Sequence, residues 1–531
     1  MVVPESAKPV PKQASLGDAL IPVIFLMISL AFAIVIYGDN AIGGPVQVSL
    51  FLSAIVAGLI GYKNSHSITR MSKAAVDSIS SAMGAIFILF AVGALIGTWN
   101  MSGTIATMTS WGIQVLSPNW FYLTAAIICG LIALGIGSAW TVMGTIGVAL
   151  IAIAAALGIN EAIAAGAVIS GAYFGDKMSP LSETTNLAPA IAGTDLYTHI
   201  RSMMVTTIPA ILIALGLFAF FGLRQDARGE IPVETAVEAI EKYYTTGIIT
   251  LIPLIVVIWL AVKRTPPTLA IITGALLGGI IAVIFQTDRV IEFAQASRLD
   301  NEAEPVGNTL NLIEGVWDAM AIGYTVDTEF DALNTLLSGG GMESMLNTIW
   351  LIMVALAFGG IMNITGFLGR LIEPLRRRAK SDRGAMGAVG TTAIGINILA
   401  ADQYLAIVLT GNVYKYDFRR RGIAPQSLSR QIEDTATVTS PLIPWNSCGA
   451  YAAGVLGVET IAYFPWCFFN LINPVLSFIY AALGFQIKKI PPEVASEDPD
   501  KDATAPKETD FYGVSGQNAD ELPIGEKRDE D

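Results

Sequence analysis

The sequence predicts an all-α polytopic membrane protein, an inverted-repeat secondary transporter with broken helices and re-entrant hairpins. Of its 531 residues, 53% are hydrophobic and 14% are charged, which is too apolar for a soluble protein of ordinary composition. About 11–13 apolar segments follow one another along the chain. In addition, short motifs recur about 262 residues apart. The apolar composition predicts a membrane protein, and the recurring motifs predict that its two halves are structural repeats.

The apolar segments were located by length, since a helix needs about 20 residues to cross a bilayer. We expect spans at residues 16–37, 44–62, 75–99, 119–136, 140–158, 203–223, 246–262, 268–286, 345–369, 386–400, 403–416 and 462–485. Shorter apolar pieces lie at 104–116, 161–174, 187–193 and 447–458. We expect these pieces to form re-entrant hairpins or half-helices. The first span lacks a clear signal-peptide cleavage site, so we expect it to remain as a helix.

The distribution of charge predicts the orientation, because short cytoplasmic loops are enriched in Lys and Arg. Basic residues collect at four positions: 63–73, 263–264, 370–383 and 415–421. Segment 287–344 instead carries eleven acidic residues against two arginines, which places it outside. The N-terminal tail, 1–15, and the acidic tail, 488–531, then fall in the cytoplasm of a multi-pass cell-membrane protein. The acidic tail has the composition of a disordered segment.

Two motif pairs define the expected repeat. Gly97, Asn100 and Gly103 match Gly360, Asn363 and Gly366 at an offset of 263, and Ser179-Pro180-Leu181 matches Ser440-Pro441-Leu442 at an offset of 261. Asn100 and Asn363 are expected at hinges. The domains are therefore expected at 16–223 and 246–487, with a linker at 224–245 and the insertion 287–344. The charge rule gives the two halves opposite orientation, as in many secondary transporters.

The stretch GAYFGDKMSPLSETTNLAPA, residues 171–190, places ionisable groups between apolar segments. Ionisable groups at membrane depth usually line a substrate or ion path. We expect five residues here to bind a cation or proton: Asp176, Glu183, Thr184, Thr185 and Asn186. Gly175 and Pro180 are expected to interrupt the helix. An extramembrane loop rich in turn residues remains the alternative.

The corresponding stretch in the second half is EDTATVTSPLIPWNSCGAY, residues 433–451. Its candidate ligands are Glu433, Asp434, Thr439, Asn446 and Ser447, with hinges at Pro441 and Pro444. Upstream, Asp402 lies in an apolar run, and its expected first-half equivalent is Thr141. Asp402 could instead cap a helix end.

The chemistry of these residues suits sodium, a hard cation that prefers oxygen ligands. Carboxylates at low dielectric can hold a proton, whereas a nearby cation favours their ionised form, so a proton and sodium can compete for one group. Such competition is the simplest physical route to antiport. Lys177 is expected to balance charge when sodium is absent, although it could instead extend to the membrane interface.

Other functions lack support in the sequence. A Walker phosphate-binding loop is absent, which argues against an ATP-driven pump. We find no basic stripe for nucleic acid and no cysteine spacing for zinc or disulfides. We therefore expect a transporter rather than an enzyme, with no cofactor.

The stretch 171–190, followed by GTDLYTHIRSMM at 193–204, resembles the signature region of the NhaC sodium/proton antiporters of the ion transporter superfamily. The resemblance continues at 323–362 and 427–451 and covers about residues 16–487. It implies exchange of sodium, with lithium left open, for protons, in support of pH homeostasis. A sodium- or proton-coupled lactate/malate exchanger of the same family is the alternative, and a homodimer is left open. An anionic substrate would need cationic side chains at its site, and intramembrane Lys and Arg other than Lys177 are scarce. We therefore favour cation exchange over carboxylate exchange.

Overall fold

The computed structural model describes residues 12–37, 41, 43–225, 233–298, 307–328, 334 and 337–490. Helices dominate this part of the chain, which contains no strand and only two isolated bridges, Tyr324 with Gly339 and Ile423 with Lys489. The predicted all-α class is confirmed. Most of the two predicted tails, and residues 226–232 of the predicted linker, lie outside the described residues.

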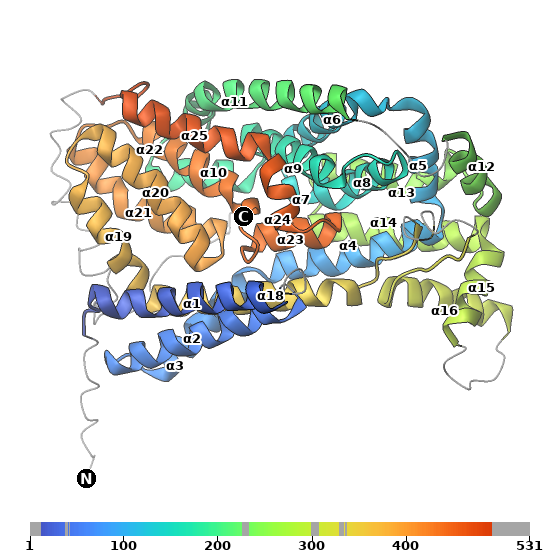
Figure 1. The fold of residues 1–531 in the computed structure, drawn as a ribbon, viewed down its shortest axis with the longest axis horizontal. Helices are drawn as coiled ribbons and strands as arrows, with labels where there is room; N and C mark the ends of the chain where they lie inside the picture. The colour runs from blue at the N-terminus through green and yellow to red at the C-terminus, as the bar shows by residue number, and fades with distance from the viewer. Residues whose placement is uncertain are drawn as a thin grey trace, which may run out of the picture.

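The helices fall into two sets with connecting elements (Figure 1). The chain begins with α1 Leu16–Tyr37, α2 Pro45–Lys63 and α3 Ile68–Ser81. The first set is α4 Met83–Met101, α5 Thr104–Val115, α6 Phe121–Ile136, α7 Ala139–Val142, α8 Val148–Ala156, α9 Glu161–Met178, α10 Glu183–Ala192 and α11 Leu196–Arg224. The connecting helices are α12 Val233–Tyr243, α13 Ile252–Val262, α14 Pro267–Phe285, α15 Thr287–Arg298 and α16 Asn308–Ala321. The second set is α18 Leu346–Ile364, α19 Phe367–Arg378, α20 Asp382–Ala400, α21 Gln403–Arg420, α22 Pro425–Ile432, α23 Ser447–Leu456, α24 Thr460–Tyr463 and α25 Phe468–Leu483.

The two sets repeat one another helix by helix. Helix α4 starts at Met83 and α18 at Leu346, 263 residues later, and each is followed, two residues after its end, by a left-handed glycine, Gly103 or Gly366, which precedes the next helix. Helices α5 and α19 keep the offset of 263, and from the ends of α6 and α20 onward the offset is 264: α6 and α20 end at residues 136 and 400, and α10 and α23 start at 183 and 447. This agreement of bounds is too extensive for chance, so we infer that the chain contains a duplicated unit.

The expected register of the second motif pair is wrong. At an offset of 264, Ser179 corresponds to Ile443 rather than to Ser440, as shown by the matching starts of α10 and α23. The error arises because the stretch from the end of α19 to the end of α20 is one residue longer than the stretch from the end of α5 to the end of α6, which shifts every later pair. The Ser-Pro-Leu triplets therefore match in sequence but occupy different positions in the fold.

The two sets run in opposite directions (Figure 1). Helix α4 leads to α5 at the right-hand end of the molecule, whereas α18 leads to α19 at the left-hand end. Helices α12, α15 and α16 also lie at the right-hand end. The acidic connecting segment and the arginine-rich α19 are thus at opposite ends of the protein, as the charge distribution predicts.

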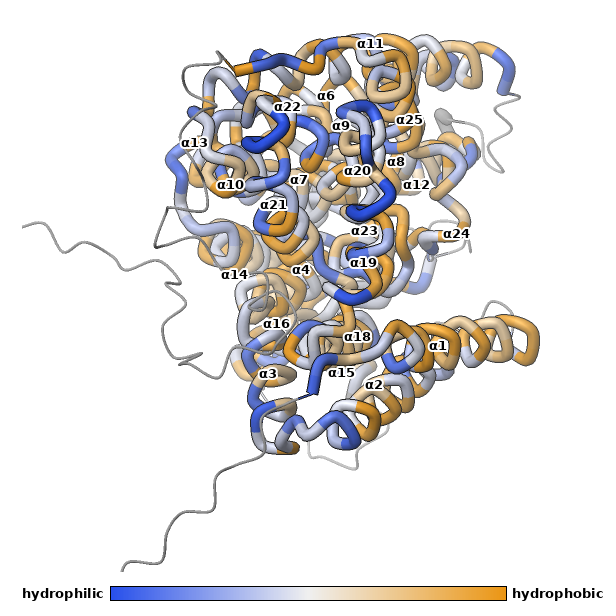
Figure 2. The backbone as a smooth tube through the Cα atoms, turned by 90° about the vertical axis from the view of Figure 1, so that its left-hand side faces the viewer, coloured by the Kyte–Doolittle hydropathy of each residue, from blue (hydrophilic) through white to orange (hydrophobic). Residues whose placement is uncertain are grey.

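Eight described helices are long and apolar enough to cross a membrane, or nine if the bent pair Thr460–Trp466 and Phe468–Leu483 forms one span. Figure 2 shows apolar α1 projecting from the body, and only 28% of an 18-residue apolar stretch of this helix is buried. The predicted spans 75–99 and 345–369 each cross a helix end, between α3 and α4 and between α18 and α19. Of the remaining predicted spans, α13 is too short to cross a membrane, and α20 and α21 are too polar. A multi-pass membrane protein follows from these helices.

Helix α9 was expected to be a short re-entrant piece at 161–174, but it is an 18-residue helix that is buried along most of its length. It packs along α6, where Gly171 and Gly175 allow close backbone contact: an added Cβ on Gly175 would lie 2.2 Å from the Gly130 carbonyl oxygen. The expected hinge at Gly175 is therefore wrong, since the glycine serves helix packing inside an unbroken helix. The break comes later, beside Pro180.

Close packing also fixes α4. A Cβ added to Gly97 would lie 1.9 Å from the carbonyl oxygen of Ala319 in α16. In the second set, a Cβ on Gly360 would lie 2.4 Å from the Ser78 hydroxyl oxygen of α3. The glycines of the recurring motif thus mark equivalent helix contacts in the two halves.

We predict that Gly97→Ala destabilises the protein by about 1–3 kcal/mol, because α4 and α16 must separate to admit the methyl group. The measurement is the melting temperature of the purified protein in detergent. Gly135→Ala in α6 is the control, since nothing lies within 4 Å of its added Cβ. Equal melting temperatures for the two variants would contradict the close contact.

Candidate cation site

Four polar side chains cap helices where the two sets are interrupted. Ser138 caps α7, Ser182 caps α10, Asp402 caps α21 and Asn446 caps α23, each by accepting a hydrogen bond from a backbone N–H of the first turn. Ser138 and Asp402 are 264 residues apart, and so are Ser182 and Asn446. The first-half equivalent of Asp402 is therefore Ser138, and the expected equivalence with Thr141 is wrong. These caps satisfy backbone groups that would otherwise be unpaired at the breaks.

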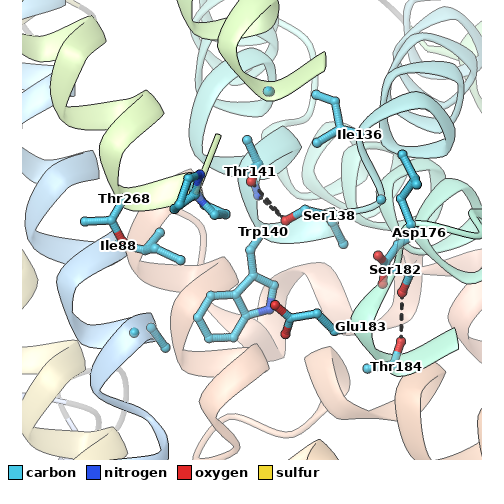
Figure 3. Close-up of a pocket in the computed structure, with 18 of the residues that line it drawn as sticks. Ile88, Ile136, Ser138, Trp140, Thr141, Asp176, Ser182, Glu183, Thr184 and Thr268 are labelled. Carbon is cyan, nitrogen blue, oxygen red and sulfur yellow. Dashed lines mark hydrogen bonds between the residues drawn. The ribbon is translucent and has the colours of Figure 1, made fainter. Parts of the chain in front are cut away.

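A cavity of about 1010 Å³ lies among these breaks. Both sets of helices contribute to its lining, together with the connection between α13 and α14 (Figure 3). The predicted residues that line it are Asp176, Pro180, Glu183, Thr184, Asp402 and Ser447. The cavity is open, since Glu183 is exposed and Tyr404 is 38% exposed. Residues from far apart in the sequence thus share one solvent-reachable space.

Three carboxylates face one cationic side chain in this cavity. Asp176 at the end of α9 is 8% exposed, and Asp402 accepts a hydrogen bond of 2.7 Å from the Leu405 N–H. Glu183 accepts a hydrogen bond of 2.7 Å from the Tyr404 hydroxyl of the second set. The cation is Arg264, on the α13–α14 connection. With the acids ionised, the cavity carries excess negative charge.

Neutral oxygens surround the carboxylates. The hydroxyls of Ser182 and Thr184 are 3.1 Å apart, and those of Ser138 and Thr141 are 2.9 Å apart. Residues Ile136 and Gly137, at the carboxyl end of α6, also line the cavity. The end of a helix carries unpaired carbonyls and partial negative charge, which attract cations. Carboxylate, hydroxyl and carbonyl oxygens are therefore available together.

A buried ion pair lies apart from the cavity lining. Lys177 Nζ is 2.6 Å from Asp434 Oδ1, and both side chains are 0% exposed. Three neutral donors complete the coordination of the Asp434 carboxylate. They are the Thr206 hydroxyl at 3.0 Å, the Asn473 amide at 3.2 Å and the Ser477 hydroxyl at 2.9 Å. The expectation that Lys177 could extend to the interface is wrong, because the side chain is fully enclosed and paired.

Two further ionisable side chains are buried beside this pair. Glu433 is 0% exposed, and the hydroxyls of Thr437 and Thr184 lie beside its carboxylate. Arg430, one turn before Asp434, is 1% exposed, and its Nε and Nη1 have no acceptor among the residues that the structure describes. Arg430 was not identified from the sequence as an intramembrane cation. Its presence weakens the argument that intramembrane cations are too scarce for an anionic substrate. The charge of the cavity must therefore decide between cation and anion exchange.

The remaining predicted ligands support the local fold. The Thr185 hydroxyl donates to the Lys177 carbonyl at 3.1 Å, and the exposed Asn186 amide donates to the Ser182 carbonyl at 2.7 Å. Thr439 accepts a hydrogen bond from Asn397, and Asn446 donates to the Asn397 carbonyl. None of these four predicted ligands lines the cavity. Their polar atoms instead close the turns at the helix breaks.

The predicted hinge residues differ in their surroundings. Pro441 and Pro444 lie in the interruption between α22 and α23, where the Pro441 carbonyl accepts the Tyr463 hydroxyl at 2.7 Å. Asn100 is buried and Asn363 is exposed, and each lies in the last turn of its helix. The direction of the chain changes just after them, at the left-handed glycines.

Sequence reasoning also missed side chains on α11 and α25 that hold Asp434. Asn473 and Ser477 are four residues apart on α25, so they share a helix face, and this polar spacing in an apolar helix was a detectable signal. His199 on α11 is also part of this buried polar region: it is 0% exposed, and its Nδ1 lies 2.8 Å from the Ser429 hydroxyl.

Comparison with known proteins places this arrangement in a family. The model of the Na+/H+ antiporter family matches residues 171–298 and 307–485. The chain is 33% identical to the Na(+)/H(+) antiporter NhaC of Alkalihalophilus pseudofirmus, over 90% of this chain and 98% of the relative. It is 34% identical to the arginine/ornithine antiporter ArcD of Halobacterium salinarum, over 92% and 96%. It is 32% identical to the malate-2H(+)/Na(+)-lactate antiporter of Bacillus subtilis, over 88% and 96%. The chain belongs to the Na+/H+ antiporter family.

Proposed function

We propose that this protein exchanges sodium for protons at the cavity, with Asp176 and Asp402 as the carboxylates that take up either ion. The observation that carries the proposal is that these two carboxylates, one from each set of helices, line the same open cavity. The protein is thus a secondary active transporter of its family, and the structure adds a candidate position for the exchange.

The chemistry of exchange follows from the surroundings of the two acids. Asp176 has the Ser182 hydroxyl and the Ala139 backbone N–H beside it, and Asp402 accepts a backbone N–H. These few donors leave lone pairs free for a cation. The low dielectric of the protein interior disfavours an ionised carboxylate without a counter-ion. A proton must therefore neutralise the carboxylate when sodium leaves. Sodium and protons therefore exclude each other at the same oxygens.

Alternating access requires one part of the protein to move against another. The Lys177–Asp434 pair joins α9 of the first set to the π-helical turn Glu433–Thr437 of the second set. We therefore assign Lys177 a structural role as the fixed counter-ion of Asp434, in place of charge balance for departing sodium. The pair keeps this part of the core electrically neutral while the cavity residues exchange ions.

We further propose that the cavity opens to the cytoplasm, since Arg264 of a basic connection lies at its edge. The same rule places both termini in the cytoplasm and segment 287–344 outside. The transported ions are sodium and protons, and lithium is expected to replace sodium.

The alternative is exchange of a small carboxylate, as the name of the Bacillus subtilis relative indicates for that protein. An anion would enter a cavity with three carboxylates and one arginine, and like charges at low dielectric repel strongly. The cavity charge therefore favours a cation. Uptake of labelled lactate or malate by the purified protein in liposomes would instead support the alternative.

We predict that Asp176→Asn and Asp402→Asn each reduce sodium-driven proton movement at least about a hundredfold, since neither amide can exchange a proton. Proteoliposomes with an enclosed pH-sensitive dye report the flux. The control is Asp195→Asn at the exposed cap of α11, where Asn caps a helix as well as Asp does. Full activity in either cavity variant would remove that residue from the mechanism.

For the buried pair, we predict that Lys177→Met and Asp434→Asn each destabilise the protein by about 3–5 kcal/mol, because each leaves a charge unpaired. The double variant should recover part of the loss, because both charges are then absent. Melting temperatures in detergent give the comparison. Purely additive losses would show that the two side chains do not act as a pair.

A further inference from the structure

Basic side chains gather at the end of the molecule where α19 and α21 lie, the left-hand end in Figure 1. They belong to three ranges, 370–383, 415–421 and 488–489, which together contain twelve basic residues and three acidic residues. We call these ranges the basic surface. Its exposed basic side chains include Arg377, Arg378, Lys380, Arg383, Arg420 and Lys488.

The three ranges are in direct contact. The Arg421 guanidinium at the end of α21 donates a hydrogen bond of 3.1 Å to the Lys380 carbonyl, which lies between α19 and α20. Lys489 Nζ lies 2.5 Å from Asp382 Oδ2, 107 residues away in the sequence, and donates to the Arg421 carbonyl at 3.0 Å. Segments far apart in the chain therefore form one continuous surface.

The acidic residues within the basic surface are already paired. Glu373 contacts both Arg370 and Arg377, and Asp417 contacts Arg421 at 2.9 Å. The third acid is the partner of the lysine described above. The three ranges nevertheless keep a net charge of +9. Like charges gathered on one face repel one another and attract an anionic partner.

The chain leaves the described structure from this same surface. The Ala424 N–H donates to the Lys488 carbonyl at 2.8 Å, and the Ile490 N–H donates to the Gly422 carbonyl at 3.0 Å. These bonds hold the chain after α25 against the turn between α21 and α22. Residues 491–531, which lie outside the described residues, contain thirteen acidic and four basic residues, a net charge of −9. The chain beyond Ile490 thus starts at the basic surface and carries an equal and opposite charge.

We propose that the basic surface is the docking site of residues 491–531 of the same chain. Attachment at Ile490 gives this segment an effective concentration of order millimolar at the surface. Each exposed charge pair is weak, so docking depends on many pairs and is lost when salt screens them. The proposal does not rest on the proposed function, because no residue of the basic surface lines the cavity.

Anionic lipid headgroups are the other partner that such a surface could attract. Two observations favour the chain itself. The acidic segment is attached where the surface lies, and its charge matches the charge of the surface.

The test measures a distance in the full-length protein with Ala482→Cys and Ser515→Cys, each carrying a spin label. Ala482 is exposed in the last turn of α25, whereas the native Cys129, Cys448 and Cys467 are buried and should not take up label. Pulsed EPR gives the distances in uncharged detergent at about 0.01 M and about 1 M salt, between which the screening length falls from about 30 Å to about 3 Å. We expect a short, narrow distribution at low salt. At high salt it should broaden and lengthen to the roughly 25–30 Å of a flexible chain of this length.

Charge reversal locates the docking site. Arg378→Glu combined with Lys380→Glu should give the long distribution already at low salt, because both exposed side chains then repel the acidic segment. The matched control combines Lys73→Glu with Lys263→Glu, exposed lysines on α3 and between α13 and α14. It changes the net charge equally and should keep the short distribution.

Equal distributions at the two salt concentrations would overturn the proposal. Release by the control variant would overturn it as well, since overall charge rather than this surface would then hold the segment. The measurement is repeated at low salt in nanodiscs of phosphatidylglycerol and of phosphatidylcholine. A long distribution in phosphatidylglycerol alone would show that anionic headgroups occupy the surface, and would rule out the acidic segment as its partner in an anionic membrane.

Discussion

Unpaired backbone groups are costly inside a membrane, and this constraint determines where the chain can interrupt its helices. The structure meets it by placing polar caps at four of the helix starts: Ser138 and Asp402 in one equivalent pair, Ser182 and Asn446 in the other. Because the caps are side chains with oxygens, the same residues that satisfy the backbone also bring ligand atoms to the interior. The cavity lies where these interruptions meet. The same positions therefore serve both to cap the backbone and to supply oxygen atoms for a cation.

The charged groups of the interior divide into two classes. Asp434 is surrounded by Lys177 and three neutral donors, so its charge is compensated inside the protein. Asp176 and Asp402 border open space and have few donors. A compensated carboxylate has little to gain from sodium, whereas an uncompensated one needs either sodium or a proton. We therefore propose that the cavity acids carry the exchange reaction and that the buried pair belongs to the scaffold.

Sequence reasoning could predict the class of fold and the opposite orientation of the two halves. Hydropathy, the glycines of the first motif pair and the positions of basic residues carry that information directly. It could also single out Asp176 and Asp402, because isolated acids in apolar runs are costly, and both line the cavity. It could not predict the repeat register, since one extra residue between the end of α19 and the end of α20 shifts all later pairs.

The assignment of individual ligands was less predictable. In the sequence, Asp434 and Asp176 look alike, and only packing reveals that Lys177 reaches the former across a separation of 257 residues. Similarly, Thr185 and Asn186 have suitable oxygens, but their hydrogen atoms serve nearby carbonyls. Arg430 was overlooked because it lies in a short polar segment between apolar runs. Such roles depend on tertiary contacts that composition and spacing do not encode.

The most direct measurement is proton release on sodium binding. Sodium is added to purified protein in weakly buffered solution, and the pH change is compared with the amount of bound sodium. If sodium and protons exclude each other at Asp176 and Asp402, bound sodium displaces protons over the pH range in which the protein transports. Sodium that binds in that range without releasing protons would contradict competition at the cavity carboxylates.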